Sequence, residues 1–274
     1  MSLANFIPAI WSARLLANLD KALVYGNLVD RSYEGEVRFG NTLKLNRPDS
    51  ITVGNYTGTI TYQTPTSTPR TLTIDQQRYF AFKVDDISRV QANVDLVDTY
   101  SQRAAYALAD SVDQYIASLY PAAGAGIATL DITATTPKVY EAFVELGRLL
   151  DEKNVPRQER WVVVSPKVYA ALLKDQSFIR STEAGQQMIL TGAVGQVAGF
   201  SVFVSNNVPV VTGATTQHKC LAGINMAIVF AGNVQEVESI RLPDEFATGV
   251  RGLYVFGASV VEPDALAVLD VRAA

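Results

Sequence analysis

The sequence predicts an α+β fold in which a strand-rich segment, a long helix and a mixed region follow one another along the chain. Between residues 35 and 85, apolar and polar residues alternate with a period of two, which is typical of strands. Over residues 86–121, apolar residues recur every three or four positions, which is typical of an amphipathic helix. Helix and strand patterns then alternate irregularly, without βαβ repetition or a visible internal repeat.

Composition restricts the class of protein further. Of the 274 residues, 48% are hydrophobic, which is sufficient for a substantial core. The 23 basic and 27 acidic residues give a net charge of −4, so tight, direct DNA recognition through a basic surface is disfavoured. The single cysteine, Cys220, cannot form an internal disulfide, and no apolar run approaches the roughly 20 residues of a membrane helix. We therefore expect an intracellular origin and no membrane partner.

Residues 1–34 are predicted to form an N-terminal arm with an amphipathic helix over residues 5–25. Pro8 suits the first turn of this helix, and Gly26 suits its end. The helix could pack on its own domain or on a neighbouring subunit, and the sequence does not decide between them. Its apolar positions are Ile7, Ile10, Trp11, Leu15, Leu19 and Leu23.

Residues 35–85 are predicted to form an extended β-loop. Its middle, residues 55–71, is rich in threonine and has little to bury, so we expect an exposed excursion. Because an isolated two-stranded ribbon is marginally stable in water, we expect the loop to lie on another subunit. Our candidate intersubunit contacts are basic and aromatic residues of this loop, and the basic ones are expected to meet acidic groups of neighbours. They are Arg38, Lys44, Arg47, Tyr56, Tyr62 and Arg70.

Residues 86–130 are predicted to form a long helix and a linker. Asp85 or Asp86 can cap the helix, and Pro121 can end it. Unless the helix breaks at Asn93, it would span roughly 50 Å at 1.5 Å per residue. It is therefore expected to be the longest rigid element of the chain.

Residues 131–274 are predicted to contain helices and strands in irregular order. Pro137 and Pro166 each suit the first turn of a helix, and the apolar run between them suits a buried strand. We divide the region into a domain over residues 131–250 and closing strands over residues 251–274. The helices are expected at 137–151, 166–175 and 181–190, and the later strands near 219–231, 234–240, 250–261 and 265–271.

No constellation of catalytic residues emerges from the sequence. The only histidine, His218, lies in a polar stretch that predicts an exposed loop, and we expect Cys220 to be a buried, inert thiol. Neither a nucleophile elbow nor a metal-ligand spacing accompanies them. The carboxylate pairs Asp85/Asp86 and Glu236/Glu238 are interpreted as a helix cap and as one face of a strand. We therefore expect no catalytic, cofactor-binding or metal-binding residues.

The glycine run Gly192, Gly195 and Gly199 does not fit a phosphate-binding loop. A P-loop requires Gly-Lys followed by a hydroxyl residue, but Gly199 is followed by phenylalanine, and the spacing differs from a dinucleotide-binding motif. We interpret these residues as turn and close-packing glycines. Asn206 and Asn207, which follow the next strand, are expected in a turn of positive φ.

The order of these elements resembles that of the major capsid proteins of tailed bacteriophages, the Hong Kong 97-type fold. Residues 35–48 and 71–88 resemble the outgoing and returning strands of the family's extended loop, which leads into its spine helix. Residues 160–175, 195–209 and 247–269 resemble successive segments of its axial and peripheral domains. Together these stretches extend over nearly the whole chain.

The resemblance implies an N-terminal arm, an extended β-hairpin loop, a long spine helix, and peripheral and axial domains. Residues 86–130 would belong to the peripheral domain, residues 131–250 to the axial domain with peripheral strands interleaved, and residues 251–274 would be the closing strands of the peripheral domain. The implied function is structural rather than enzymatic. Such subunits self-assemble into hexamers and pentamers of an icosahedral virion head around double-stranded DNA, and they assemble in the bacterial cytoplasm.

The resemblance also implies partners. The subunit would bind copies of itself and a portal, and would enclose DNA without sequence-specific binding. A separate scaffolding protein is expected, because only some 35 residues precede the extended loop. Two alternatives stay open. An encapsulin-type nanocompartment shell shares the fold, and a soluble α+β enzyme acting through carboxylates belongs to another class of protein.

Overall fold

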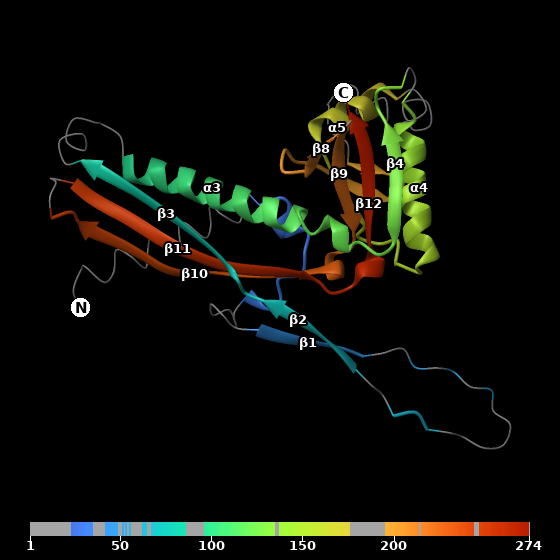
Figure 1. Cartoon of the computed structure of the whole chain (residues 1–274), viewed down its shortest axis with the longest axis horizontal. Coiled ribbons are helices and arrows are strands. Elements are labelled where there is room, and N and C mark those ends of the chain that lie inside the picture. Colours follow the sequence, from blue (N-terminus) through green and yellow to red (C-terminus); the bar gives the residue numbers. More distant parts are fainter. Residues whose placement is uncertain are drawn as a thin grey trace.

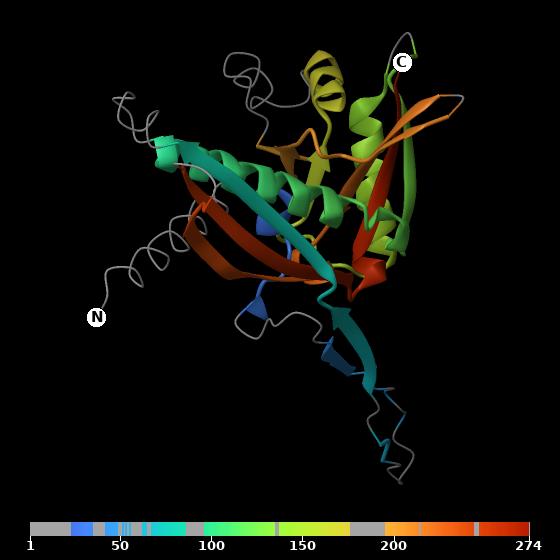
Figure 2. The ribbon, with the colours of Figure 1, turned by 60° about the vertical axis from the view of Figure 1, so that its left-hand side comes forward.

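A computed structural model describes residues 23–34, 42–48, 51, 53, 55, 62–64, 67–85, 96–134, 137–175, 195–213, 215–243 and 247–273. These residues form three parts, which are visible in Figure 1: a long helix beside a three-stranded sheet, a two-stranded ribbon, and a seven-stranded sheet with two helices. Figure 2 shows the ribbon pointing away from both sheets. The mixed helix and sheet composition confirms the predicted α+β class.

The helix α3 (Leu96–Ala117) packs along a three-stranded antiparallel sheet of order β10-β11-β3. Aromatic side chains join the two layers: the ring centroids of Tyr115 and Phe256 lie 5.5 Å apart, and those of Tyr100 and Phe82 lie 5.6 Å apart. The sheet strands are β3 (Gln76–Asp85), β10 (Ile228–Arg241) and β11 (Ala247–Val260).

The 22 residues of α3 correspond to about 33 Å. The helix ends at Ala117, before the proline that we predicted would end it, and a short 3-10 turn, η3 (Tyr120–Ala122), follows. The predicted start of the helix and its break at Asn93 lie outside the described residues. Among the described elements α3 has the most residues, but the 14-residue strands β10 and β11 extend further because a strand rises about 3.3 Å per residue, and the helix ends earlier than predicted.

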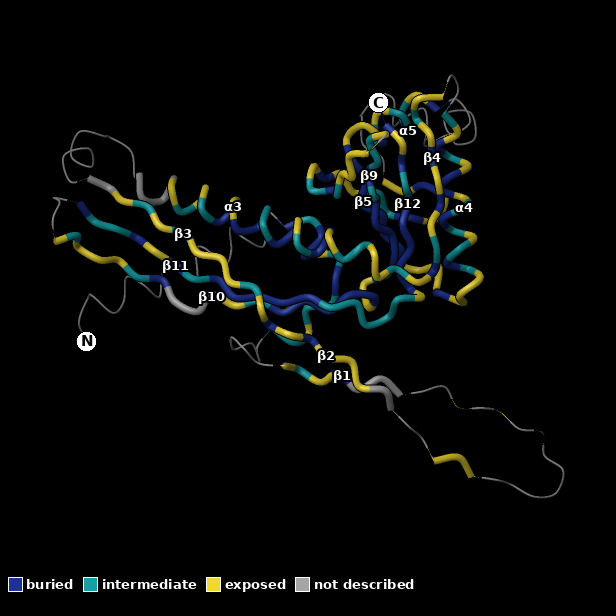
Figure 3. Tube along the Cα trace, viewed as in Figure 1, coloured by how far each residue is buried: buried dark blue, intermediate teal, exposed yellow. Residues whose placement is uncertain are grey.

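The ribbon consists of β1 (Thr42–Pro48) and β2 (Ser67–Thr73), which pair antiparallel. Its base packs on the chain's own three-stranded sheet through a second small core, which is separate from the main one. Figure 3 shows that burial in the described part of the ribbon is confined to this base. Gly257 of β11 permits this approach, because a Cβ atom there would lie 2.3 Å from the carbonyl oxygen of Thr73. The buried members of the small core are Leu45, Leu72, Ile74, Val229, Ala231 and Val255.

The ribbon is shorter than the loop predicted over residues 35–85. β3, which we assigned to the loop, instead pairs with β11 from Ala247↔Asp85 to Phe256↔Gln76. Periodicity identified β3 correctly as a strand, but it carries no information about which strand is its partner. The first predicted strand, at residues 37–39, lies outside the described residues.

The seven-stranded sheet has the order β4-β12-β9-β5-β7-β6, with β8 paired to β9. The helix α4 (Val139–Glu152) packs on β4 and β12, and α5 (Pro166–Lys174) follows the fully buried β5. Proline starts α5 as predicted, whereas α4 begins two residues after Pro137. The strands are β4 (Gly126–Asp131), β5 (Trp161–Val164), β6 (Gln196–Val197), β7 (Phe200–Val204), β8 (Val210–Thr212), β9 (Thr216–Gly223) and β12 (Leu266–Ala273).

The C-terminal strands differ from the predicted arrangement. β11 belongs to the three-stranded sheet, but β12 crosses to the seven-stranded sheet, where it pairs parallel with β4 and antiparallel with β9. Residues 251–274 therefore do not close a single sheet. The strand predicted near 219–231 is divided by the 3-10 turn η4 (Asn225–Ala227), and η5 (Pro263–Ala265) precedes β12. The predicted helix at 181–190 lies outside the described residues.

Residues 23–30 join the helix α3 to the three-stranded sheet. The buried carboxylate of Asp113, on α3, accepts hydrogen bonds from the backbone N–H groups of Val24 (2.7 Å) and Gly26 (3.1 Å). Burial raises the pKa of Asp113, although these N–H donors oppose the shift. Asp30 continues the connection, because its carbonyl oxygen accepts a hydrogen bond from the N–H of Phe230 on β10 at 2.9 Å.

The end of the predicted N-terminal helix differs from the structure. Residues Tyr25–Asn27 form a 3-10 turn, η1, so Gly26 lies inside a turn and does not follow an α-helix. Residues 5–22 of the predicted helix lie outside the described residues. Over most of its length, the helix predicted at residues 5–25 therefore stays a prediction.

Candidate assembly surfaces

The predicted contact residues lie in different parts of the ribbon. Lys44 and Arg70 are both exposed, and they occupy neighbouring rungs of the β1–β2 ladder, opposite Thr71 and Leu45 respectively. Because side chains alternate across a strand, Lys44 and Arg70 point to opposite faces of the ribbon.

The other predicted contact residues are described less fully. Tyr62 lies beyond the paired part of the ribbon and is 90% exposed. Arg47 belongs to β1, where only its backbone is described, and Arg38 and Tyr56 lie outside the described residues. The structure therefore brings Lys44 and Arg70 close along the ladder, but it does not bring Tyr62 to them.

Two apolar residues of the outer ribbon were missed by the sequence reasoning. Ile51 is 74% exposed and Val53 is 93% exposed, so both side chains project into solvent within this subunit. Their spacing of two residues could have indicated one apolar face, but the surrounding threonines and glycines favoured a purely polar excursion. With Tyr62, they give the ribbon an apolar surface that no described part of the same chain covers.

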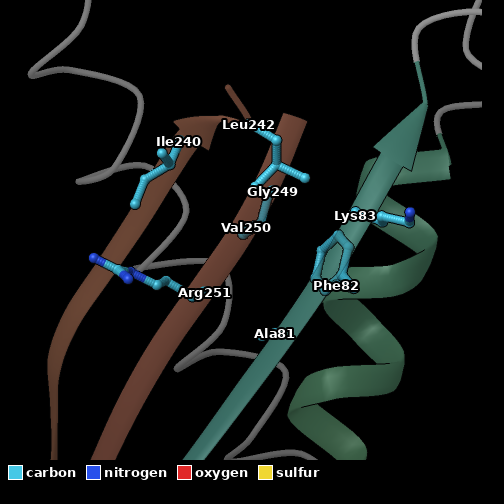
Figure 4. A pocket seen from close by; sticks show the side chains of 8 residues that line it. All are labelled: Ala81, Phe82, Lys83, Ile240, Leu242, Gly249, Val250 and Arg251. Carbon is cyan, nitrogen blue, oxygen red and sulfur yellow. The ribbon is translucent and has the colours of Figure 1, made fainter. Parts of the chain in front are cut away.

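A second exposed surface lies on the three-stranded sheet. The residues of β3 that alternate with the helix-facing Phe80 and Phe82 point to the other face, where Tyr79 is 80% exposed. Two adjoining pockets of about 430 and 390 Å³ lie along this part of the sheet, and both include Ala81 and Arg251. Figure 4 shows the larger one. We call this region the open sheet face.

The open sheet face carries little chemistry. The guanidinium of Arg251 donates through Nε to a carboxylate oxygen of Glu238 at 2.8 Å. Glu238, one of the two carboxylates predicted on this strand, therefore forms an ion pair with the neighbouring strand. The larger pocket is otherwise lined mainly by apolar and glycine residues, with one lysine. Such a surface suits protein contact better than catalysis.

A third pocket, of about 680 Å³, lies between β4 and α4 and contains three carboxylates. The hydroxyl and N–H of Thr133 lower the pKa of Asp131, and Arg148 lowers the pKa of Glu145. Glu141 forms an exposed ion pair with Lys138 at 2.9 Å. A general acid requires a carboxyl whose pKa is raised towards neutrality, and the shifts of Asp131 and Glu145 go in the opposite direction.

The prediction for His218 was wrong, whereas that for Cys220 is confirmed. His218 lies on β9 and is buried, with neither ring nitrogen hydrogen bonded. Burial lowers the pKa of His218, and the nearby Lys167 lowers it further. Cys220 is a buried free thiol, and burial raises its pKa to about 12, so it is not an activated nucleophile.

Among the described residues, no group of three or more His, Cys, Asp or Glu side chains is arranged to hold a metal ion. No helix in the described part of the chain is both long and apolar enough to cross a membrane. Asp85 is the last residue of β3, and Asp86 lies outside the described residues, so the predicted helix cap is not described.

The comparison with known proteins agrees with this arrangement. Residues 68–269, roughly three quarters of the chain, match the family described as phage capsid protein. The chain belongs to this family. It is therefore a major capsid subunit, a structural component of the virion capsid. No curated protein matches the chain.

Solved capsid structures share the fold of this capsid subunit. The structure of Mycobacterium phage Che8 is 26% identical, covers 90% of each chain and has a TM-score of 0.71. The capsid of cyanophage P-SCSP1u is 18% identical, covers 92% of this chain and 89% of that chain, and has a TM-score of 0.73. A virus-like particle from Pyrococcus furiosus is 14% identical, covers 96% and 99%, and has a TM-score of 0.57. The two less similar sequences show the fold alone.

Proposed function

We propose that the capsid subunit assembles into hexamers and pentamers of an icosahedral head that encloses double-stranded DNA. The observation that carries this proposal is the ribbon, whose base packs on its own sheet while its outer half exposes Ile51, Val53 and Tyr62. Assembly would take place in the host cytoplasm with a separate scaffolding protein and a portal. In the terms of the family, the seven-stranded sheet corresponds to the axial domain and the three-stranded sheet to the peripheral domain.

The energetics of the ribbon favour a partner. Full burial of a side chain such as valine or isoleucine contributes about 1.5–3 kcal/mol, and the outer ribbon leaves this free energy unused in the isolated subunit. The β1–β2 pair gains little stability by itself, because isolated two-stranded ribbons are marginally stable in water. We infer that a neighbouring subunit covers the apolar side chains of the ribbon.

The basic residues of the ribbon would orient this contact. Lys44 and Arg70 lie on opposite faces of the ladder, so one of them would face the neighbour and the other would face solvent or a third subunit. Arg38, Arg47, Tyr56 and Tyr62 remain candidate contacts on the same ribbon.

Charge reversal tests the ribbon contact. Lys44→Glu combined with Arg70→Glu is expected to lower the yield of shells several-fold while the subunit stays folded, because both side chains are exposed. Lys138→Glu, at the exposed N-cap position of α4, is the control. Sedimentation velocity measures the assembled fraction, and an unchanged yield in the double variant would contradict the assigned contacts.

The encapsulin-type alternative rests on the likeness to the virus-like particle of Pyrococcus furiosus. That likeness, at 14% identity, concerns the fold alone, whereas the family match over residues 68–269 and the 26% identity to the Mycobacterium phage Che8 structure favour the phage head. Electron microscopy of purified particles separates the two, since small uniform cages without DNA would favour the nanocompartment. The enzyme alternative predicts a discrete monomer or small oligomer in size-exclusion chromatography.

A further inference from the structure

One long edge of the seven-stranded sheet is formed by β4. Among the described strands, β4 has a partner on one side only, because it pairs parallel with β12 and ends the strand order of the sheet. The backbone N–H and C=O groups along its other edge therefore face away from any described strand. Sheets commonly protect such an edge with lysine or proline, and neither occurs within Gly126–Asp131.

The pocket of about 680 Å³ between β4 and α4 lies along this edge. Side chains alternate across a strand, so Leu130, which is buried, points to one face of the sheet, and Thr129 and Asp131, which are exposed, point to the other. All three line the pocket, which therefore extends around the edge of β4. Helix α4, which lies beside β4 in Figure 1, forms the opposite wall. We call this space the β4 groove.

The β4 groove is acidic. Asp131, Glu141 and Glu145 line it together with Lys138, so three carboxylates accompany one ammonium group. Two of the carboxylates form ion pairs at the surface, Glu141 with Lys138 at 2.9 Å and Glu145 with Arg148. Because exposed ion pairs contribute little free energy, the cations of an incoming segment can replace these partners. The charge of the groove therefore favours a basic occupant.

Apolar side chains accompany the carboxylates on both walls. On the strand, Ile127 is 63% exposed and alternates with the buried Ala128, so it lies on the same face as Asp131. On the helix, Val144 is 49% exposed and follows Glu141 by three positions, which places the two side by side. An occupant with both apolar and basic side chains would therefore find a matching group on each wall.

We propose that the β4 groove binds an extended segment of a different protein, which adds a strand to the free edge of β4 and carries basic and apolar side chains. In this mode of recognition, main-chain hydrogen bonds supply affinity and alternate side chains supply specificity. The chain's own strand of similar composition, β1, is not free to fill the groove, because Leu45 is buried at the base of the ribbon. The inference goes beyond the proposed function, since it requires no neighbouring copy of the subunit.

Peptide binding tests the chemistry of the occupant. The probe is a fluorescein-labelled peptide, Lys-Val-Lys-Val-Lys-Val, which matches the six residues of β4, and fluorescence anisotropy measures its binding to the unassembled subunit. We expect the acidic peptide Glu-Val-Glu-Val-Glu-Val to bind at least tenfold more weakly. Combining Glu141→Gln with Glu145→Gln should weaken binding of the basic peptide about fivefold. Glu152→Gln, on the same helix but outside the groove, is the matched control and should bind like the wild type.

N-methylated peptides test the addition of a strand. The N–H groups of alternate residues point to opposite edges of a strand, so methylation of the valine nitrogens alone or of the lysine nitrogens alone blocks one edge. We expect one of these two peptides to bind like the unmodified peptide and the other to lose binding. Hydrogen–deuterium exchange of the backbone amides of residues 126–131 should slow when the unmodified peptide binds. Equal binding of the two methylated peptides, or unchanged exchange in β4, would refute strand addition.

The remaining outcomes separate the β4 groove from other occupants and from the proposed function. No binding of the basic peptide up to about 1 mM, or equal binding of the acidic peptide, would overturn the proposal. Slower exchange in β4 when the subunit assembles without peptide would assign the groove to a second copy of the chain, and the proposal of a different protein would then be wrong. Failure of the wild type to form shells would overturn the proposed function and would leave peptide binding unchanged.

Discussion

At the scale of single residues, Gly257 sets how closely the ribbon approaches the three-stranded sheet. A Cβ atom at this position would lie 2.3 Å from the carbonyl oxygen of Thr73 and 3.0 Å from Cα of Ile74, both backbone atoms that cannot rotate away. We expect Gly257→Ala to destabilise the unassembled subunit by about 1–3 kcal/mol. Gly249→Ala, on the same strand, meets its nearest atom at 3.6 Å and is the control in urea unfolding. Equal stabilities would contradict the close approach.

At Gly199, a glycine is favoured by the backbone conformation and not by a lack of space. Its φ is 85° and that of Ala198 is 48°, so the pair forms the tight turn that joins β6 to β7. Nothing lies within 4 Å of a Cβ added at Gly199, so the cost of Gly199→Val comes from the backbone and should be about 1–2 kcal/mol. Gly195→Val also meets nothing within 4 Å and lacks the positive φ. Thermal unfolding of the two variants should therefore show a lower midpoint for Gly199→Val alone.

His218 should make the stability of the subunit depend on pH. Its folded pKa is lowered by burial and by Lys167, so the unfolded chain takes up a proton at a higher pH than the folded chain does. Stability from the neutral imidazole is therefore present above the unfolded pKa of about 6.5 and is lost as the pH falls below it. We expect the melting temperature of the wild type to fall more between pH 7.5 and pH 5 than that of His218→Leu. Parallel decreases in the two proteins would contradict this account.

Some properties of single residues could be predicted from the sequence and others could not. The free, inert Cys220 and the turn role of Gly199 were predicted correctly, because each depends on local chemistry. The burial of His218 was not predicted, because it depends on β8 and on neighbouring elements that periodicity does not assign to β9. Asn206 and Asn207 were expected at positive φ but do not have it, and the hydroxyl oxygen of Ser205 accepts a hydrogen bond from the N–H of Asn207 at 3.1 Å in this turn.

At the scale of elements, the ribbon divides into an anchored base and an exposed outer half. Deleting residues 51–64, with a short glycine turn in their place, leaves β1, β2 and the small core around Leu72 unchanged. We expect this variant to unfold within about 1 kcal/mol of the wild type, since the deleted side chains that are described contribute no burial. Its assembled fraction should fall at least tenfold in sedimentation velocity. Normal shells from the deletion variant would show that the outer ribbon is dispensable.

Elements with a strong periodic pattern were predicted well. The prolines expected at the first turns located α4 to within two residues and α5 to within one residue. The four consecutive buried residues of β5 followed from an uninterrupted apolar run. The sequence did not show that β3 belongs to the three-stranded sheet and not to the ribbon. Strand pairing is decided by contacts such as Phe82↔Val250, between residues that lie far apart in the sequence.

At the scale of the whole molecule, the order of elements was more informative than any motif. The resemblance of this order to capsid proteins agrees with the family match over residues 68–269. The interleaving of the two sheets was predicted only in outline. β11 and β12 separate at η5 and enter different sheets, and β10 follows η4 directly from β9. The passage of the chain from one sheet to the other depends on the packing of the complete chain, which a local sequence pattern does not indicate.

The central claim is that this chain is the building block of a closed head, and electron microscopy of the purified, assembled subunit tests it most directly. The account predicts closed icosahedral shells with six-fold and five-fold clusters, in which the ribbon of each subunit lies on a neighbour. A protein that remains a monomer or small oligomer under all assembly conditions would contradict it.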